Sequence, residues 1–495
     1  MSPGAALLAI LTTAAPLRFG ADAQGGAPYV FYDAVDPNRL TGFEVELANE
    51  LARRLGTTAR LVPGPWDRLL ELLARGDFDV AINGIEVSES ARAVALLSEP
   101  YFRAAEQLTV RAGDGAAPRT LAELKGRKVG TLPGSAAEKI LLRVEAEVRT
   151  YDGGQDDIYK DLALGRIDAV LLDQPAAHYY GDIDPRFVAV PGEFGSVEYA
   201  VALPKEAEAR LAQVNAALRA MRDDGFLRRL DERWGLWSAE NAALLHDANP
   251  TPLEPPLEFE RWKDAVGTQP PFLERVRDRY PRVLPMLLRG AGMTLLVSTL
   301  AMTLAVGLGL ALAFLRRYGS APLRVLSRAY VEFFRGTPLL IQLTMVYFGL
   351  PQLGVQLDPM TAGILALGLN YAAAEAENYR AGLESVPQGQ VEAATVLGFT
   401  RFQTLRFITG PQAVRVSLPP MTNDFIALLK DSSLVSLVTL TELTKTYSNL
   451  ANAMRDHLGL GVLVAVMYLL LGLPFAQLAR VMERRFSRYL PGGDP

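Results

Sequence analysis

The sequence predicts two parts of different fold class: a two-lobed α/β domain in the N-terminal half and an all-α bundle of five membrane spans in the C-terminal half. The chain has 495 residues, more than one domain normally holds. Strand-like and helical segments alternate over residues 17–237, as in α/β layers. Apolar runs of membrane-spanning length begin only after residue 280.

The composition excludes several kinds of site. The sequence contains no cysteine, so these residues can form no disulfide, thiolate metal site or thiol nucleophile. The three histidines are far apart and lack the spacing of a metal site. A net charge of −5 gives no reason to expect nucleic acid as a partner. We therefore expect neither a metal nor a nucleic acid.

The N-terminal half divides into a leader and two lobes. Residues 1–16 hold a short apolar run, which we interpret as a truncated export signal; a frayed first strand is the alternative. The binding domain is expected at 17–238, and segments 106–111 and 196–203 are expected to cross between lobes around a ligand cleft. The lobes are predicted at 17–108 with 200–238, and at 112–195. Strands are predicted at 17–20, 59–62, 80–85, 128–131, 169–173 and 199–202, and helices at 44–55, 66–74, 135–145, 159–164 and 206–223.

A proline-rich stretch, 239–284, is predicted to be a semi-rigid linker with a helix near 259–265. The membrane part follows at 285–495. Its spans are predicted at 289–315, 337–353, 360–382, 411–430 and 458–481. Arginines cluster after spans one, three and five, so these ends are expected in the cytoplasm, together with the C-terminus. The two-lobed domain is then expected on the outer face of the membrane.

Residues 384–406 form a polar loop between spans three and four. A helix over 390–397 is expected to end at Gly398 in a left-handed stop, and an apolar stripe restarts at Phe399. From periodicity alone, this segment is either a short helix pair that docks a soluble partner or an ordinary amphipathic loop. The loop, with its Glu392-Ala393-Ala394 core and the flanking Phe333–Gln342 and Leu429–Ser436 stretches, resembles the coupling loop of polar amino-acid ABC importer permeases. The resemblance implies that a separate ATPase docks on Gly389, Glu392, Ala393, Ala394 and Gly398.

The N-terminal half carries a second resemblance. Thr41–Leu47, Gly76–Val80, Ile82–Gly84, Ser98–Phe102 and Gly165–Val170 are similar to the polar amino-acid-binding proteins of ABC importers, solute-binding family 3. This implies the two-lobed periplasmic-binding-protein fold, with the binding domain on the outer face of a bacterial cytoplasmic membrane.

The resemblance assigns candidate ligand-binding residues, most of which also have a structural explanation. Asp173 is expected to take the ligand ammonium, or only to cap a helix, and both can hold. Gly134 and Ser135 open a helix whose N–H groups would hold the ligand carboxylate. Trp66 would stack on the ligand side chain or fill a core. The remaining candidates are Asp22, Tyr29, Asn83, Gly84 and Ser88.

Two positions depart from the family pattern. Ala91 stands where the family has an arginine that clamps the ligand carboxylate, and Arg92 follows it. One residue on a helix rotates a side chain by about 100°, so Arg92 either reaches the cleft through a rearranged turn or faces solvent. Glu86 replaces a Ser or Thr and adds negative charge. Together with Asp22 and Trp66, it favours a cationic ligand: arginine, lysine, ornithine or an amine without a carboxylate. A neutral amino acid stays open if Glu86 pairs internally.

Four polar residues fall in or beside the fourth span, where charge is costly unless it faces a pore or a partner. They line the translocation path or belong to a cluster in the headgroup region: Asn423, Asp424, Lys430 and Asp431.

The sequence thus predicts a non-enzymatic importer subunit. It contains no phosphate-binding Gly-x-x-x-x-Gly-Lys-Ser/Thr motif, so ATP is expected on a partner ATPase and no cofactor on this chain. One bundle is half a pore of the family, so a second copy is expected, as a homodimer or with a homologous permease. A ligand-binding receptor or channel, and a dehydratase, are the alternatives from other function classes.

Overall fold

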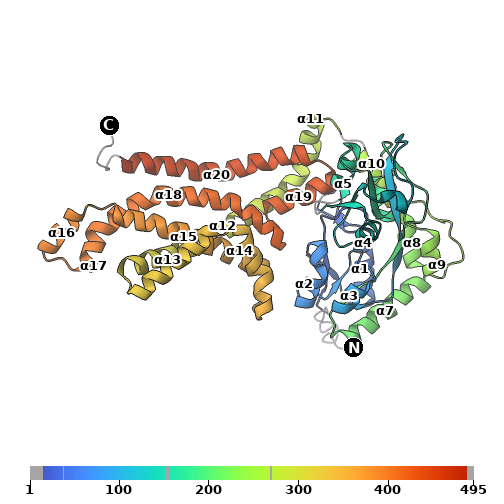
Figure 1. The fold of residues 1–495 in the computed structure, drawn as a ribbon, viewed down its shortest axis with the longest axis horizontal. Helices are drawn as coiled ribbons and strands as arrows, with labels where there is room; N and C mark the ends of the chain where they lie inside the picture. The colour runs from blue at the N-terminus through green and yellow to red at the C-terminus, as the bar shows by residue number, and fades with distance from the viewer. Residues whose placement is uncertain (1–14, 37, 152–154, 268–269, 488–495) are drawn as a thin grey trace, which may run out of the picture. The chain divides into compact units, whose positions relative to one another are not determined.

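The computed structural model describes residues 15–36, 38–151, 155–267 and 270–487 (Figure 1). The chain divides into two compact units: Met1–Val283 with Ser448–His457, and Leu284–Tyr447 with Leu458–Pro495. The expected export signal falls almost entirely on residues 1–14, outside the described ranges.

The first sheet forms the centre of lobe one. Its order is β4-β1-β5-β13-β6, with β1 parallel to β4 and β5. β13 runs antiparallel to β5 and β6 because the chain enters it on its return from lobe two, so the expected parallel sheet is mixed. The strands are β1 (Leu17–Ala21), β4 (Ala59–Pro63), β5 (Val80–Ala81), β6 (Leu96–Leu97) and β13 (Ala202–Leu203).

The second sheet forms lobe two, in the order β11-β7-β10-β8-β9. β10 and β9 run parallel to β8, whereas β7 is antiparallel to β10 and β11. The strands are β7 (Phe102–Arg111), β8 (Lys128–Thr131), β9 (Glu147–Thr150), β10 (Ala169–Asp173) and β11 (Phe187–Ala189).

Two adjacent strands carry the chain between the lobes. β12 (Ser196–Tyr199) pairs antiparallel with the first half of β7, from Phe102 to Ala105. From Glu106 to Arg111, β7 already belongs to the sheet of lobe two. The crossing therefore lies a few residues before the predicted 106–111 segment, because β7 is one continuous strand shared by hinge and lobe.

Helices cover both sheets and bury their apolar stripes in two clusters, one around Leu47, Leu51 and Trp234 and one around Leu108 and Leu141. The helices are α1 (Phe43–Arg54), α2 (Leu69–Arg75), α3 (Glu89–Val94), α4 (Ala136–Arg143), α5 (Gln155–Ala163), α6 (Gln174–Tyr180), α7 (Glu208–Asp223), α8 (Phe226–Arg233) and α9 (Ala239–Leu244).

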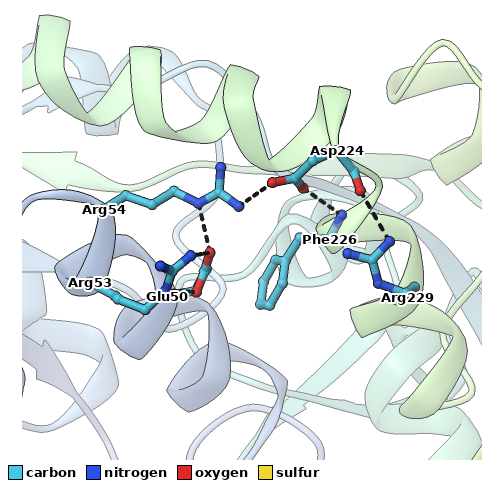
Figure 2. A network of polar contacts seen from close by, with 6 residues as sticks. All are labelled: Glu50, Arg53, Arg54, Asp224, Phe226 and Arg229. Carbon is cyan, nitrogen blue, oxygen red and sulfur yellow. Dashed lines mark hydrogen bonds and ion pairs between the residues drawn. The ribbon is translucent and has the colours of Figure 1, made fainter.

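Charged side chains fasten the end of α1 to the turn between α7 and α8 (Figure 2). Glu50 accepts from Arg53 and Arg54, each at 2.7 Å, and Arg54 also donates to Asp224 at 2.5 Å. Asp224 in turn accepts the backbone N–H of Phe226 at 3.0 Å, which starts α8. The hydrogen bond from Arg53 lowers the pKa of Glu50 to about 2. Two sequence-distant segments of lobe one are thus held by one ion-pair network.

Part of the predicted linker belongs to the binding unit. The expected helix near 259–265 is present as α10 (Leu257–Gly267), and its Phe259, Trp262 and Val266 are buried in the core of that unit. Their spacing places them on one helix face. Arg261 also pairs with Asp33 at 2.6 Å. The proline-rich segment is therefore packed at its centre, unlike the extended tether that its composition predicts.

The second unit is helical. Each predicted span coincides with a helical segment, but among the described residues only Phe272–Tyr318 and His457–Met482 are long and apolar enough to cross a bilayer, with a shorter apolar run at Leu339–Leu353. The five-span count stays a prediction. The helices are α12 (Tyr280–Tyr318), α13 (Ala321–Gly336), α14 (Leu339–Thr344), α15 (Pro359–Glu384), α16 (Gln388–Val396), α17 (Arg401–Thr404), α18 (Gly410–Asp431), α19 (Leu443–Met454) and α20 (His457–Ser487).

One buried carboxylate in lobe one has a full set of partners. Glu44, in the first turn of α1, is fully buried. It accepts the N–H of Gly84 at 2.6 Å, the hydroxyl of Tyr101, and the amide of Asn83 at 3.4 Å. Burial outweighs these donors and raises the pKa of Glu44 to about 7. Glu44 therefore holds the turn at Asn83 and Gly84 against α1.

We expect Glu44 to make the stability of the binding unit depend on pH. Between the ordinary pKa of 4.5 and about 7, the folded state keeps a proton that the unfolded chain releases. The free energy of unfolding therefore falls as pH rises through this window, by about 3 kcal/mol. Urea unfolding of the binding unit at several pH values should show this contribution, and Glu44→Gln should reduce the slope.

Glu50→Gln is the matched control for this measurement. Because the folded pKa of Glu50 lies near 2, its carboxylate is ionised in both states above the ordinary pKa of 4.5, and the substitution should leave the slope unchanged. An unaltered slope in Glu44→Gln would contradict the assignment.

Candidate functional site

Hydrogen bonds join the two lobes of the binding unit where ligand residues were expected. The hydroxyl of Tyr29, in lobe one, donates to Asp173, at the end of β10 in lobe two. The backbone N–H of Ala27 donates to the hydroxyl of Tyr180 at 3.1 Å. We call the region defined by these contacts and by the Glu86–Ala136 contact below the interlobe interface.

Asp173 caps a helix and faces the opposite lobe at the same time. Its Oδ1 accepts the N–H of Ala176 at 2.9 Å, which caps α6, and also accepts the hydroxyl of Tyr29. Burial raises the pKa of Asp173, and the Tyr29 hydrogen bond opposes that shift. The two roles expected for this residue, helix cap and partner for an ammonium group, are geometrically compatible.

Glu86 occupies the helix end that was expected to hold the ligand carboxylate. Its Oε1 accepts the backbone N–H of Ala136, in the first turn of α4, at 2.7 Å, and its Oε2 lies 3.6 Å from the Nζ of Lys139. Ser135 caps the same helix by accepting from Glu138 N at 3.2 Å. Gly134 precedes it in the left-handed region, at φ 76°. Burial raises the pKa of Glu86, against the Ala136 hydrogen bond.

Trp66 and Asp22 lie together on lobe one. The indole of Trp66 donates to the carbonyl of Asn83 at 2.8 Å, and its ring is 3.9 Å from where a Cβ on Gly134 would lie. Trp66 thus faces the opposite lobe. Asp22 accepts the N–H groups of Gln24, at 2.9 Å, and of Trp66, at 3.2 Å. Its carboxylate therefore organises this loop.

The structure places Arg92 on the exposed face of α3, whereas Ala91 is buried. Ser88 caps α3 by accepting from Ala91 N at 3.2 Å, so the turn before the helix is regular. This arrangement matches the alternative in which Arg92 faces solvent. Ser88 likewise serves the helix in this structure.

Sequence reasoning missed two residues of this region. Glu106 is 4% exposed and stands opposite Asp173 in the β7–β10 ladder. Tyr199 is buried, with its hydroxyl 3.3 Å from that of Tyr29. The only available signal was their position in the crossing segments, since neither lies in a motif of the resemblance.

In the helical unit, two of the four polar residues around α18 have partners on α15. Asp424 accepts from Asn378 at 2.8 Å, and Asp431 accepts from Tyr371 at 2.7 Å. Asn423 and Lys430 are exposed. Glu375, which sequence reasoning did not single out, is fully buried at the crossing of α15 and α12, close to Gly309.

The predicted coupling loop is a helix pair at one end of the helical unit (Figure 1). α16 ends where Gly398 adopts φ 82°, the left-handed stop that the sequence predicts. Ala394 is buried, whereas Gly389, Glu392 and Ala393 are exposed. The apolar residues after them are exposed too, with Val396 at 87% and Leu397 at 74%.

Two families match this chain. Residues 17–236 match the bacterial extracellular solute-binding proteins, family 3, and residues 305–488 match the binding-protein-dependent transport system inner membrane component. Both are components of transporters rather than enzymes.

Individual relatives match one half each. The probable amino-acid ABC transporter permease YckA of Bacillus subtilis is 34% identical over 42% of this chain and 91% of its own length. The L-cystine-binding protein TcyJ of Escherichia coli is 40% identical over 40% of this chain and 76% of its own length. A crystal structure of a mutant of ArgBP from T. maritima is 32% identical, covers 44% of this chain and 94% of that one, and has a TM-score of 0.41.

The permease relatives imply a membrane location with the binding domain outside it. The chain therefore belongs to the amino-acid ABC importers. It contains both a family 3 solute-binding domain and a permease domain.

Proposed function

We propose that this importer takes up a basic amino acid: arginine, lysine or ornithine. The observation that carries the proposal is the charge of the interlobe interface. Asp173, Glu86 and Glu106 contribute carboxylates to it, while Arg92, the nearest residue to the family's clamping position, is exposed. Glu86 pairs with Lys139 at 3.6 Å. The buried Glu106 and the partly buried Asp173 form no ion pair among the described residues. Such carboxylates favour a ligand that supplies positive charge.

The aromatic residues of the interface suit such a ligand. Trp66 faces Gly134 across the lobes, and a guanidinium or ammonium group over an indole face gains a cation–π interaction. Asp173 would take the α-ammonium group, with Tyr29 holding its carboxylate in place. The exposure of Arg92 leaves the α4 N-terminus as the expected partner of the ligand carboxylate.

A cationic amine without a carboxylate is the second candidate ligand. It is favoured by the position of Glu86, whose carboxylate already accepts the Ala136 N–H. An amino acid must displace Glu86 or bind beside it, whereas an amine need not. The two candidates differ by one ligand group, so a comparison of arginine with agmatine separates them.

We further propose that a separate ATPase, which binds the ATP, docks on α16 and α17 in the cytoplasm. The exposed side chains of Val396 and Leu397 support this, since apolar groups so fully exposed mark interaction surfaces when they cluster. In this proposal the C-terminus is also cytoplasmic, and two copies of the permease domain form the pore. Asp424 and Asp431 line the translocation path through it.

Titration of the binding unit with amino acids is expected to separate Asp173 from Arg92. Asp173→Asn removes the charge but keeps a good helix cap, so the Kd for arginine should rise about tenfold to a hundredfold. Arg92→Ala should change it by less than about twofold, as for an exposed charge. Calorimetry with arginine, lysine, ornithine, glutamine and agmatine measures both effects.

A Kd for glutamine below that for arginine would show that the basic preference is wrong. Tighter binding of agmatine than of arginine would favour the amine. A large loss of affinity in Arg92→Ala would mean that the turn before α3 rearranges when ligand binds.

Leu397→Asp is expected to abolish ligand-stimulated ATP hydrolysis in proteoliposomes that contain the chain and a co-expressed amino-acid ABC ATPase. A carboxylate at a 74% exposed position costs little in folding but disrupts an apolar contact. Leu253→Asp, at a 70% exposed leucine of the binding unit, is the matched control and should hydrolyse ATP normally. Equal stimulation in both variants would exclude α16 as the docking surface.

A further inference from the structure

Glu106 stands beside Asp173 on the neighbouring strand. The two residues are direct partners in the antiparallel β7–β10 ladder. Direct partners point to the same face of a sheet, with Cβ atoms about 5 Å apart. Further along the strands, that face buries Leu108 and Leu171 in the core of lobe two. At the end of the ladder, the same face therefore presents two carboxylates instead of apolar side chains.

The Glu106 carboxylate is buried without a hydrogen-bond partner for one oxygen. The residue is 4% exposed, and its Oε2 accepts no hydrogen bond among the described residues. The titratable groups that face it are the carboxyl groups of Asp173 and Glu86 and the phenol of Tyr199. Lys139, the nearby cation on α4, pairs with Glu86 instead.

Native proteins rarely leave a buried carboxylate oxygen unpaired, because the lost hydration costs free energy that no contact returns. Burial, reinforced by Asp173 and Glu86, raises the pKa of Glu106 well above its usual range. A cation beside Glu106 would offset both the lost hydration and the repulsion from the two neighbouring carboxylates.

We propose that Glu106 and Asp173 form a paired-carboxylate site for the ammonium group of the ligand, with Glu106 supplying the second carboxylate. An ammonium group has three N–H donors, so it can bond Asp173 and the unpaired Oε2 of Glu106 together. The inference rests on the proposed function, in that the ligand is an amino acid. It does not depend on which side chain the ligand carries.

Binding then has a proton balance. The ammonium group enters in its charged form and favours the ionised form of Glu106, so a proton held by Glu106 passes to the buffer. Ligand binding should therefore release protons, up to one per site, at pH values below the pKa that Glu106 has before binding. A purely structural role for Glu106 would not produce this release.

The test is calorimetry on the full-length chain in lipid nanodiscs at pH 7 and at lower pH. L-Arginine and L-glutamine are titrated in buffers of different ionisation enthalpy, which gives the number of protons released. We expect Glu106→Gln to bind about tenfold to a hundredfold more weakly and to release fewer protons per ligand than the wild type over this pH range. Glu106→Asp should keep the proton release while losing affinity, because the carboxylate stays but is withdrawn by one methylene.

Asp231→Asn is the matched control. Asp231, on α8, is also buried, at 2% exposed, and its Oδ2 lacks a partner among the described residues. This variant removes a similar carboxylate outside the interlobe interface and should match the wild type in affinity and proton release. Wild-type behaviour of Glu106→Gln, or equal losses in Glu106→Gln and Asp231→Asn, would overturn the proposal.

The use of two ligands separates a failure of the basic preference from a failure of the paired-carboxylate site. If L-glutamine binds and L-arginine does not, the basic preference fails. The comparison of Glu106→Gln with the wild type on L-glutamine then still decides the paired-carboxylate site.

Discussion

The binding unit depends on hydrogen bonds that join its two lobes at partly buried carboxylates. Asp173 receives a hydrogen bond from Tyr29 across the interlobe interface, and Glu86 receives one from Ala136 in the reverse direction. Each contact returns part of the hydration that the carboxylate loses. The rest of the desolvation cost remains, so the stability of this arrangement depends on any charge that enters the interface.

A comparison of two buried acids distinguishes support from function. Glu44 has donors from Gly84, Tyr101 and Asn83, and it fixes the turn that contributes Gly84 to the interface. Glu106 is nearly as buried, but its Oε2 has no partner among the described residues. A satisfied carboxylate stabilises one structure, whereas an unsatisfied one lowers the free energy most when a cation arrives. The same residue type thus serves the fold at one position and the ligand at another.

Local patterns predicted the elements but not their long-range pairing. The start of β1, the helix at α10 and the left-handed stop at Gly398 follow from alternation, apolar spacing and glycine. The helix-capping role of Asp173 was also predicted. These features are set by neighbours in the sequence, and periodicity records such neighbours directly.

The residues that were missed depend on register. Glu106 meets Asp173 only because β7 runs antiparallel to β10, and a shift of one residue would turn it to the opposite face. Nothing in a single sequence fixes that register. The packing of α10 was missed for a related reason. Its apolar stripe can be recognised in the sequence, but the core that buries Phe259 and Trp262 is formed by residues far earlier in the chain.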